Sequence, residues 1–283
     1  PVWIKLMIID AHTHIFSSDR NKYPLAAPQS TYRPITDGSV ELLRAQMVEA
    51  GVDRAVTISP WFHGWDIRYT LDALQAHRSW LAVVALVDQT SADGPQQLAR
   101  YVHEHGVCGL RIQGQISGLG RFDDPAATPI WEKAADLGLP IDINATHAEY
   151  AQVESRIRQF PQIPVILDHC GYISADLSPH TPTVEPVLRL AQYPNVYAKL
   201  TFLGLPSQAA YPFTDVHWMA RAIVDAFGAE RCLYGSNFPT IQYNPLMSYR
   251  QTMQLFAEEI ELTEAERAWI LGGTAAKLWQ WQA

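Results

Sequence analysis

The sequence is poor in cysteine and contains no long apolar run. Its three cysteines, Cys108, Cys170 and Cys232, are odd in number and lack paired spacing. This argues against a disulfide framework and fits a reducing compartment, so we expect a cytoplasmic protein. Each cysteine lies in an apolar run, which favours a small core residue over a reactive thiol. No stretch approaches about 18 consecutive apolar residues, so no membrane-spanning helix is predicted.

Basic residues are also scarce. The chain has 21 Lys and Arg against 29 Asp and Glu, a net charge of −8, and no basic cluster. Nucleic-acid and anionic-membrane partners are therefore not expected. The expected partner is a small-molecule substrate, which can still be anionic because a pocket can be locally basic. A homo-oligomer is left open, because tryptophans near the end of the chain can form an interface.

What the sequence does contain is a regular alternation of two patterns. Short apolar, β-branched runs alternate with amphipathic segments, several of which end at a glycine. Eight such runs occur, at 7–12, 54–59, 81–87, 108–113, 140–144, 164–169, 196–201 and 232–237. Amphipathic segments lie between or after them, for example at 40–50, 96–105, 129–137, 148–160 and 214–227.

Repeated strand and helix segments predict parallel βαβ units, and eight of them predict a (β/α)8 TIM barrel. We expect one domain, residues 1–283. The rival fold is a doubly wound open sheet, which more often carries a glycine-rich turn after its first strand; residues 10–14 are not such a turn. Two long loops, 23–34 and 174–186, follow the first and sixth predicted strands and are candidate walls or lids of a pocket.

Three histidines stand at predicted strand ends. His12 and His14 are two residues apart, so in a strand they point to the same side. His169 ends the sixth run. Such imidazoles suit a divalent metal or acid–base catalysis, although hydrogen-bonded structural histidines remain the alternative. Asp168 precedes His169, so the strand period points it away from the site, as a supporting or loop carboxylate.

Other polar residues mark the remaining strand ends. Arg111 and Lys199 interrupt apolar strands, where a charge is costly unless it is paired. Each either binds the substrate or pairs with a carboxylate inside the barrel. His63 follows the second run and is a candidate substrate-binding residue. Asn237 closes the eighth run, and its amide can orient water or weakly bind a cation.

Taken together, these segments resemble the amidohydrolase superfamily, in particular the group that contains 2-pyrone-4,6-dicarboxylate lactonase and sugar lactonases. The resemblance runs along nearly the whole chain. Its segments are 9–14, 32–34, 51–56, 63–66, 109–111, 167–171, 235–239 and 272–276.

The resemblance implies a TIM barrel with hydrolytic chemistry at its mouth. The family's site positions fall on His12, His14, His169 and Asn237. The last departs from the family's usual aspartate, which activates water and ligates metal. Arg111 lies near the position of a lysine in two-metal relatives, so a carbamylated-lysine site is not expected. The strand-five ligand falls at Asn144, with His147 as the alternative.

The leading hypothesis is hydrolysis of a lactone or similar cyclic ester of a small anionic or polyhydroxylated molecule. His12, His14, His169 and Asn237 form the catalytic set, while His63, Arg111 and Lys199 bind the substrate. One divalent metal such as zinc, held by the three histidines, would lower the pKa of a bound water to about 7. Metal-independent catalysis, with a histidine as base, stays open. The alternatives are a metal-dependent decarboxylase and a non-catalytic binding protein.

Overall fold

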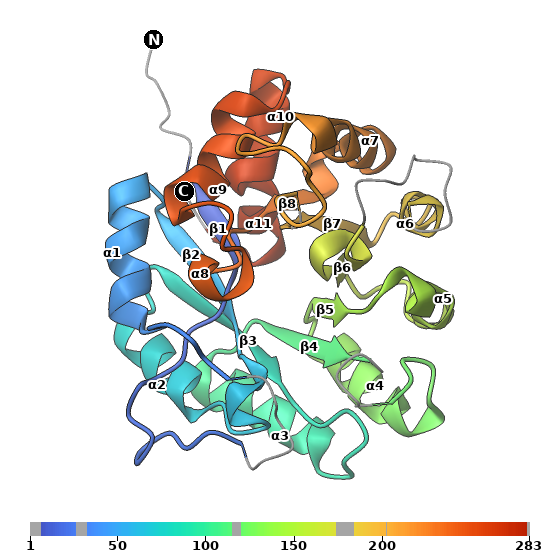
Figure 1. Cartoon of the computed structure of the whole chain (residues 1–283). Helices are drawn as coiled ribbons and strands as arrows, with labels where there is room; N and C mark the ends of the chain where they lie inside the picture. Colours follow the sequence, from blue (N-terminus) through green and yellow to red (C-terminus); the bar gives the residue numbers. More distant parts are fainter. Residues whose placement is uncertain (1–6, 27–32, 115–119, 174–183, 202, 282–283) are drawn as a thin grey trace.

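Eight parallel strands form one sheet in which each strand pairs with its sequence neighbours, in the order β1 to β8 (Figure 1). The computed structural model describes residues 7–26, 33–114, 120–173, 184–201 and 203–281. The strands are β1 Ile9–Thr13, β2 Arg54–Ile58, β3 Leu81–Leu86, β4 Gly109–Gln113, β5 Ile141–Asn144, β6 Val165–Leu167, β7 Val196–Leu200 and β8 Cys232–Tyr234. Every predicted run overlaps one of these strands, which confirms the TIM-barrel prediction.

Helices follow the strands and surround the sheet (Figure 1). They are α1 Val40–Ala50, α2 Arg68–His77, α3 Gly94–Arg100, α4 Thr128–Asp136, α5 Tyr150–Gln159, α6 Glu185–Leu190, α7 His217–Phe227, α8 Thr240–Tyr243, α9 Tyr249–Gln254, α10 Glu264–Ala268 and α11 Thr274–Leu278. The glycine stop is real at Gly51, where a left-handed residue (φ 78°) ends α1.

The barrel closes between β8 and β1 through hydrogen bonds outside the regular ladder. The Asn237 amide donates to the His12 carbonyl at 2.9 Å, and the His14 amide donates to the Phe238 carbonyl at 2.8 Å. Asp10 adds a side-chain link, because its Oδ1 accepts from the Ser236 amide at 2.9 Å. These bonds hold the end of β1 against the segment that follows β8.

Two predicted strands end earlier than the sequence pattern indicated. β6 stops at Leu167 and β8 stops at Tyr234, before His169 and Asn237. Both of these residues have positive φ angles, 55° and 57°, which no strand accommodates. The chain turns sharply at both places, and this changes where the following side chains point.

The core agrees with the composition. Strand side chains such as Val83, Leu110 and Ile143 are fully or almost fully buried. Cys170 and Cys232 are buried as well, and burial raises their thiol pKa, which fits inert core residues. Among the described residues, no helix is both long and apolar enough to cross a membrane. The predicted loops 23–34 and 174–186 lie partly outside the described residues.

Candidate active site

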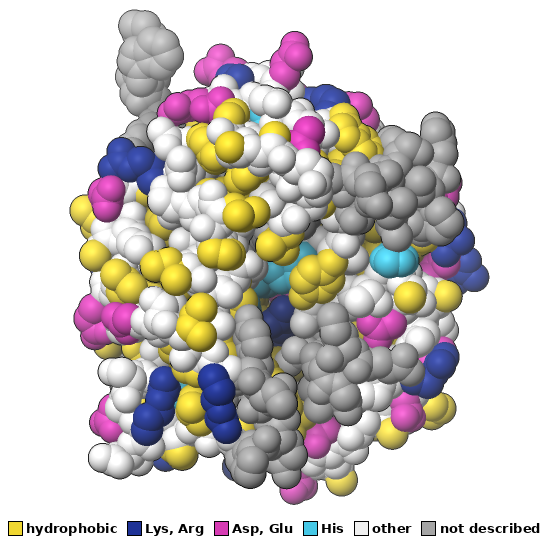
Figure 2. Space-filling view, in the orientation of Figure 1, with side chains coloured by type: hydrophobic (Ala, Val, Ile, Leu, Met, Phe, Trp, Pro, Cys, Tyr) yellow, Lys and Arg dark blue, Asp and Glu magenta, His cyan; other side chains and the backbone are white. Residues whose placement is uncertain are grey.

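The three predicted histidines come together at the carboxyl ends of the strands. The Nε2 atoms of His12 and His14 are 3.1 Å apart, and the ring centres of His12 and His169 are 4.7 Å apart. All three side chains are at least 96% buried. Histidine side chains are visible at the centre of the face in Figure 2, bordered by hydrophobic side chains. The sequence prediction that these rings share one site agrees with this geometry, while their chemical roles remain predictions.

Hydrogen bonds fix the orientation of the histidine rings. His14 Nδ1 lies 2.9 Å from the Ile58 carbonyl, which can only accept, so this nitrogen carries the proton. Burial lowers the pKa of His14 to about 3, and its ring is neutral with a lone pair on Nε2. Burial also lowers the pKa of His169 to about 3, and its Nδ1 is hydrogen-bonded to the Thr201 hydroxyl.

Asp168 lies in the site, and the prediction that it points away is wrong. Its Oδ1 is 3.4 Å from His12 Nδ1, and its side chain is fully buried. The backbone leaves the strand after Leu167, so the alternation of strand side chains no longer applies to Asp168 and His169. Burial alone would raise the pKa of Asp168, but Lys199, His12 and Arg111 hold it well below its usual range. Asp168 is therefore a carboxylate facing the His12 ring.

Two cations neutralise the carboxylates around His12. Arg111 Nε lies 3.0 Å from Asp168 Oδ2, and Lys199 Nζ lies 2.9 Å from Asp168 Oδ1. Lys199 also forms an ion pair with Asp142 on β5. The Lys199 side chain has no exposed surface, so the structure realises the second alternative stated for it, a pair with barrel carboxylates. Direct contact of Lys199 or Arg111 with a substrate stays a prediction.

Asn237 stands beside His12 through its backbone bond to that residue. Its side chain is 95% buried, and among the described residues nothing bonds its Oδ1. Asparagine is one of the residues that tolerate a left-handed backbone, which the φ of 57° requires. An amide oxygen at this place can accept a hydrogen bond from water but cannot remove a proton.

His63 occupies the turn Trp61–His63 after β2. Its Nδ1 lies 2.9 Å from the Pro24 carbonyl, so the proton is on Nδ1, and burial lowers the pKa of the ring. The segment adjoins the site through aromatic contacts: Tyr243 lies 4.8 Å from the His14 ring and 6.3 Å from the Phe62 ring, between centres. A substrate role for His63 stays a prediction.

Tyr172 is a site residue that the sequence reasoning did not find. Residues 169–172 all have positive φ angles of 44–72°, and three of the four are not glycine. A left-handed residue other than glycine costs about 1–2 kcal/mol. The turn brings the Tyr172 ring 4.9 Å from the His169 ring, and its hydroxyl donates to Asn144 Oδ1 at 2.8 Å. The signal in the sequence was only an aromatic residue soon after His169.

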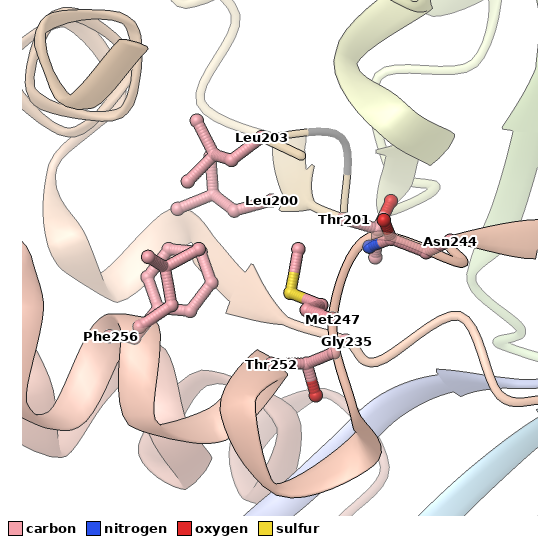
Figure 3. A pocket seen from close by; sticks show the side chains of 9 residues that line it. Leu200, Thr201, Leu203, Gly235, Asn244, Met247, Thr252 and Phe256 are labelled. Atoms are coloured by element: carbon pink, nitrogen blue, oxygen red, sulfur yellow. The ribbon is translucent and has the colours of Figure 1, made fainter. Parts of the chain in front are cut away.

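A small pocket lies next to the site, on the side of Thr201 (Figure 3). Its lining includes Thr201, Gly235, Asn244 and Met247, with leucine and phenylalanine side chains at its other end. Its volume of about 10 Å³ leaves room for roughly one water molecule. It is too small for a lactone, so we place the substrate at the histidine cluster.

Metal binding fits the site only in part. With the His12 proton on the nitrogen that faces Asp168, the lone pairs of His12 and His14 face one another at 3.1 Å, which suits two ligands of one cation. In the described part of the chain, however, no group of three or more His, Cys, Asp and Glu side chains is arranged to hold a metal ion. Asn144 at the end of β5 and Asn237 after β8 supply no charge.

Comparisons with known proteins show the family of this chain. The sequence model of the amidohydrolase family matches residues 9–281. An L-fucono-1,5-lactonase of Burkholderia ambifaria is 27% identical over 234 residues, which cover 82% of this chain and 80% of that protein.

Solved structures show the same fold. A probable 2-pyrone-4,6-dicarboxylic acid hydrolase from Acinetobacter baumannii superposes with a TM-score of 0.83 at 18% identity, covering 97% of this chain and 99% of the other. An amidohydrolase from Burkholderia multivorans with bound zinc superposes with a TM-score of 0.75 at 20% identity, with the same coverage. By its sequence along almost its whole length, this chain belongs to the amidohydrolase family and is a hydrolase.

Proposed function

We propose that this chain hydrolyses a lactone or similar cyclic ester of a small anionic or polyhydroxylated molecule. The observation that carries the proposal is the meeting of three buried imidazoles beside a carboxylate, with His12 between Asp168 and His14. The lactonase and hydrolase names of the similar proteins support the same reaction class. Opening a lactone requires an activated water and a polarised carbonyl group.

His12 and Asp168 activate the water. Asp168 Oδ1 lies 3.4 Å from His12 Nδ1, and its charge favours the ring proton on that nitrogen, which would leave the Nε2 lone pair as the proton acceptor. A carboxylate that orients a histidine base also stabilises the imidazolium that forms when the base takes a proton. This arrangement supplies a base although the family's strand-eight aspartate is replaced by Asn237. Asn237 positions the water by accepting a hydrogen bond at Oδ1, an atom without another partner among the described residues.

Arg111 supports the reaction from β4. Its guanidinium contacts Asp168 through Nε, and a planar guanidinium carries further donors that suit a carbonyl or carboxylate oxygen. Lys199, on β7, keeps Asp168 charged and in place through its ion pair. His63 binds a polar group of the substrate at the β2 side.

A divalent metal such as zinc has two fitting ligands here, His12 and His14, with His169 as the predicted third. When bound, it would supply Lewis-acid polarisation of an oxygen atom at the same place. The roles of Asn237, Arg111 and His63 described above do not depend on it. A decarboxylase is less well supported. The decarboxylases of the superfamily normally need a strand-five histidine and a strand-eight aspartate, and the resemblance puts Asn144 and Asn237 at these positions.

The test is a panel of lactones, assayed at neutral pH by release of acid. It includes sugar lactones, a pyrone dicarboxylate and a muconolactone, with protein purified without chelator. We expect at least one to be opened, and His12→Ala and His169→Ala each to lower kcat by about 10²-fold or more. His103→Ala, an exposed position, is the control. If neither site variant loses activity, the site assignment is wrong; if the wild type opens no lactone, the proposed reaction is wrong.

A further inference from the structure

We propose that Tyr172 is a substrate-binding residue that selects hydroxylated lactones. Its ring forms the wall of the site over His169, and its phenol oxygen accepts a hydrogen bond from a substrate hydroxyl group. The inference rests on the proposed lactonase function and narrows its substrate class. It comes from three observations on the segment after β6.

The first observation is the backbone. His169, Cys170, Gly171 and Tyr172 form a left-handed turn with φ angles of 55°, 44°, 72° and 59°. Conformations of this kind persist only where the surrounding structure enforces them, and they cluster at functional sites. Packing excludes a side chain at Gly171, since a Cβ there would lie 2.8 Å from the Tyr150 hydroxyl. At the start of the turn, Asp168 and His169 make contacts within the site. At its end, the turn sets the position of the Tyr172 ring.

The second observation is the exposure of the ring. Tyr172 is 38% exposed, although it lies against His169, which is only 4% exposed. The ring planes are inclined by 34° with their centres 4.9 Å apart. Tyr172 therefore presents aromatic surface beside a buried site histidine, where the flat part of a lactone ring can pack.

The third observation is the hydrogen bond of the phenol. Its hydroxyl donates to Asn144 Oδ1 at 2.8 Å, and the Asn144 amide group lies 3.4 Å from Gln113 Oε1. These neutral side chains, from the ends of β4 and β5, fix the orientation of the phenol. Because the phenol donates its proton to Asn144, any further hydrogen bond at its oxygen is one that it accepts, and a hydroxyl group can donate such a bond whereas a carboxylate cannot.

The charges of the site favour the same class of substrate. Arg111 and Lys199 contact Asp168, and Lys199 also contacts Asp142, so two cations face two carboxylate side chains. An anionic group near this cluster gains little net attraction. A site that binds a hydroxyl group by a specific hydrogen bond discriminates strongly against analogues that lack it.

The experiment compares a hydroxylated aldonolactone with a lactone of the same ring size that lacks hydroxyl groups. The variants are Tyr172→Phe, which removes only the oxygen, and Tyr172→Leu, which also removes the ring. We expect Tyr172→Phe to raise KM for the hydroxylated lactone by about 5–10-fold and to leave KM for the other unchanged. Tyr172→Leu should raise KM for both by about 10-fold, with kcat within about threefold. The matched control is Tyr193→Phe, which removes a tyrosine hydroxyl group that donates to Glu154 outside the barrel.

The outcomes separate the possible roles. If kcat falls while KM is unchanged, Tyr172 only orients His169, and the proposal is overturned. Unchanged kcat and KM in both variants overturn it as well. If the wild type turns over neither lactone, the proposed function fails, and calorimetric binding of the hydroxylated lactone still tests Tyr172. Equal Kd values for wild type and Tyr172→Phe would then refute the assigned contact.

Discussion

Replacing Asp168 by asparagine tests the centre of the site. The substitution keeps the size of the side chain and removes the charge that faces His12, Arg111 and Lys199. Lys199 retains Asp142, but Arg111 loses its ion pair while 94% buried. Removing one partner of a buried pair typically costs 3–5 kcal/mol, so we expect the free energy of unfolding to fall by about that amount.

The effect on catalysis follows from the orientation of His12. Without the carboxylate, the charge that favours the His12 proton on Nδ1 is gone. The imidazolium that forms when His12 takes a second proton also loses its counter-charge. We expect kcat for lactone opening to fall by about 10²–10⁴-fold. Steady-state kinetics measures this loss, and chemical unfolding followed by fluorescence measures the change in stability. The control is Asp66→Asn, which breaks an exposed pair with Arg68 and should cost at most about 1 kcal/mol, with kcat unchanged.

A double variant separates a role through His12 from a general structural effect. If Asp168 acts by orienting His12, then adding Asp168→Asn to His12→Ala should change kcat by less than about threefold, because the group that it orients is gone. Fully additive losses in the double variant would refute the reasoning, even if each single variant were inactive. Full activity of Asp168→Asn alone would refute it directly.

Two further predictions concern residues beside His12. Asn237→Asp adds a carboxylate at the end of β8. We expect mass spectrometry to show more zinc bound per chain, and we expect a shifted pH–rate profile. No change in either would mean that Asn237 does not face the reacting atoms. Burial raises the pKa of Asp10 from 3.8 to about 6, against the effect of its hydrogen bonds from Ser236. The folded chain thus holds this proton more tightly than the unfolded chain, so the stability it contributes is complete below about pH 4 and is lost as pH rises through about 6. Asp10→Asn should remove this loss, worth about 3 kcal/mol, in unfolding curves at about pH 4 and pH 8; an unchanged difference would contradict it.

The fold was predictable because its determinants are local and repeated. Each apolar run marks a strand, and the segments between the runs form helices, so eight repeats specify a barrel without any knowledge of contacts. The convergence of His12, His14 and His169 then follows from the barrel alone, since the carboxyl ends of parallel strands share one face. The true ends of β6 and β8, at Leu167 and Tyr234, were missed. The reason is that a positive φ at His169 or Asn237, which are not glycine, leaves little trace in one sequence.

The partners of the buried charges were harder to predict, for a different reason. Arg111 and Lys199 in apolar strands indicate that compensating carboxylates exist, but a sequence does not say which. The prediction for Asp168 failed because it extended the alternation of β6 by one residue too many. Tyr172 was missed because its place depends on four successive left-handed residues, and among these only Gly171 is of a residue type that favours such a conformation.

The arrangement also explains how the chain accommodates Asn237 where its family usually has an aspartate. Arg111 and Lys199 face Asp142 and Asp168, so these four buried charges balance one another. A further carboxylate at the end of β8 would lie beside neutral histidines with no cation left for it, and its desolvation would be uncompensated unless a metal ion or a proton came with it. An asparagine keeps a hydrogen-bond acceptor at that place without the charge. The role of a carboxylate next to the base then falls to Asp168, which follows directly after β6 and lies with its Oδ1 3.4 Å from His12 Nδ1.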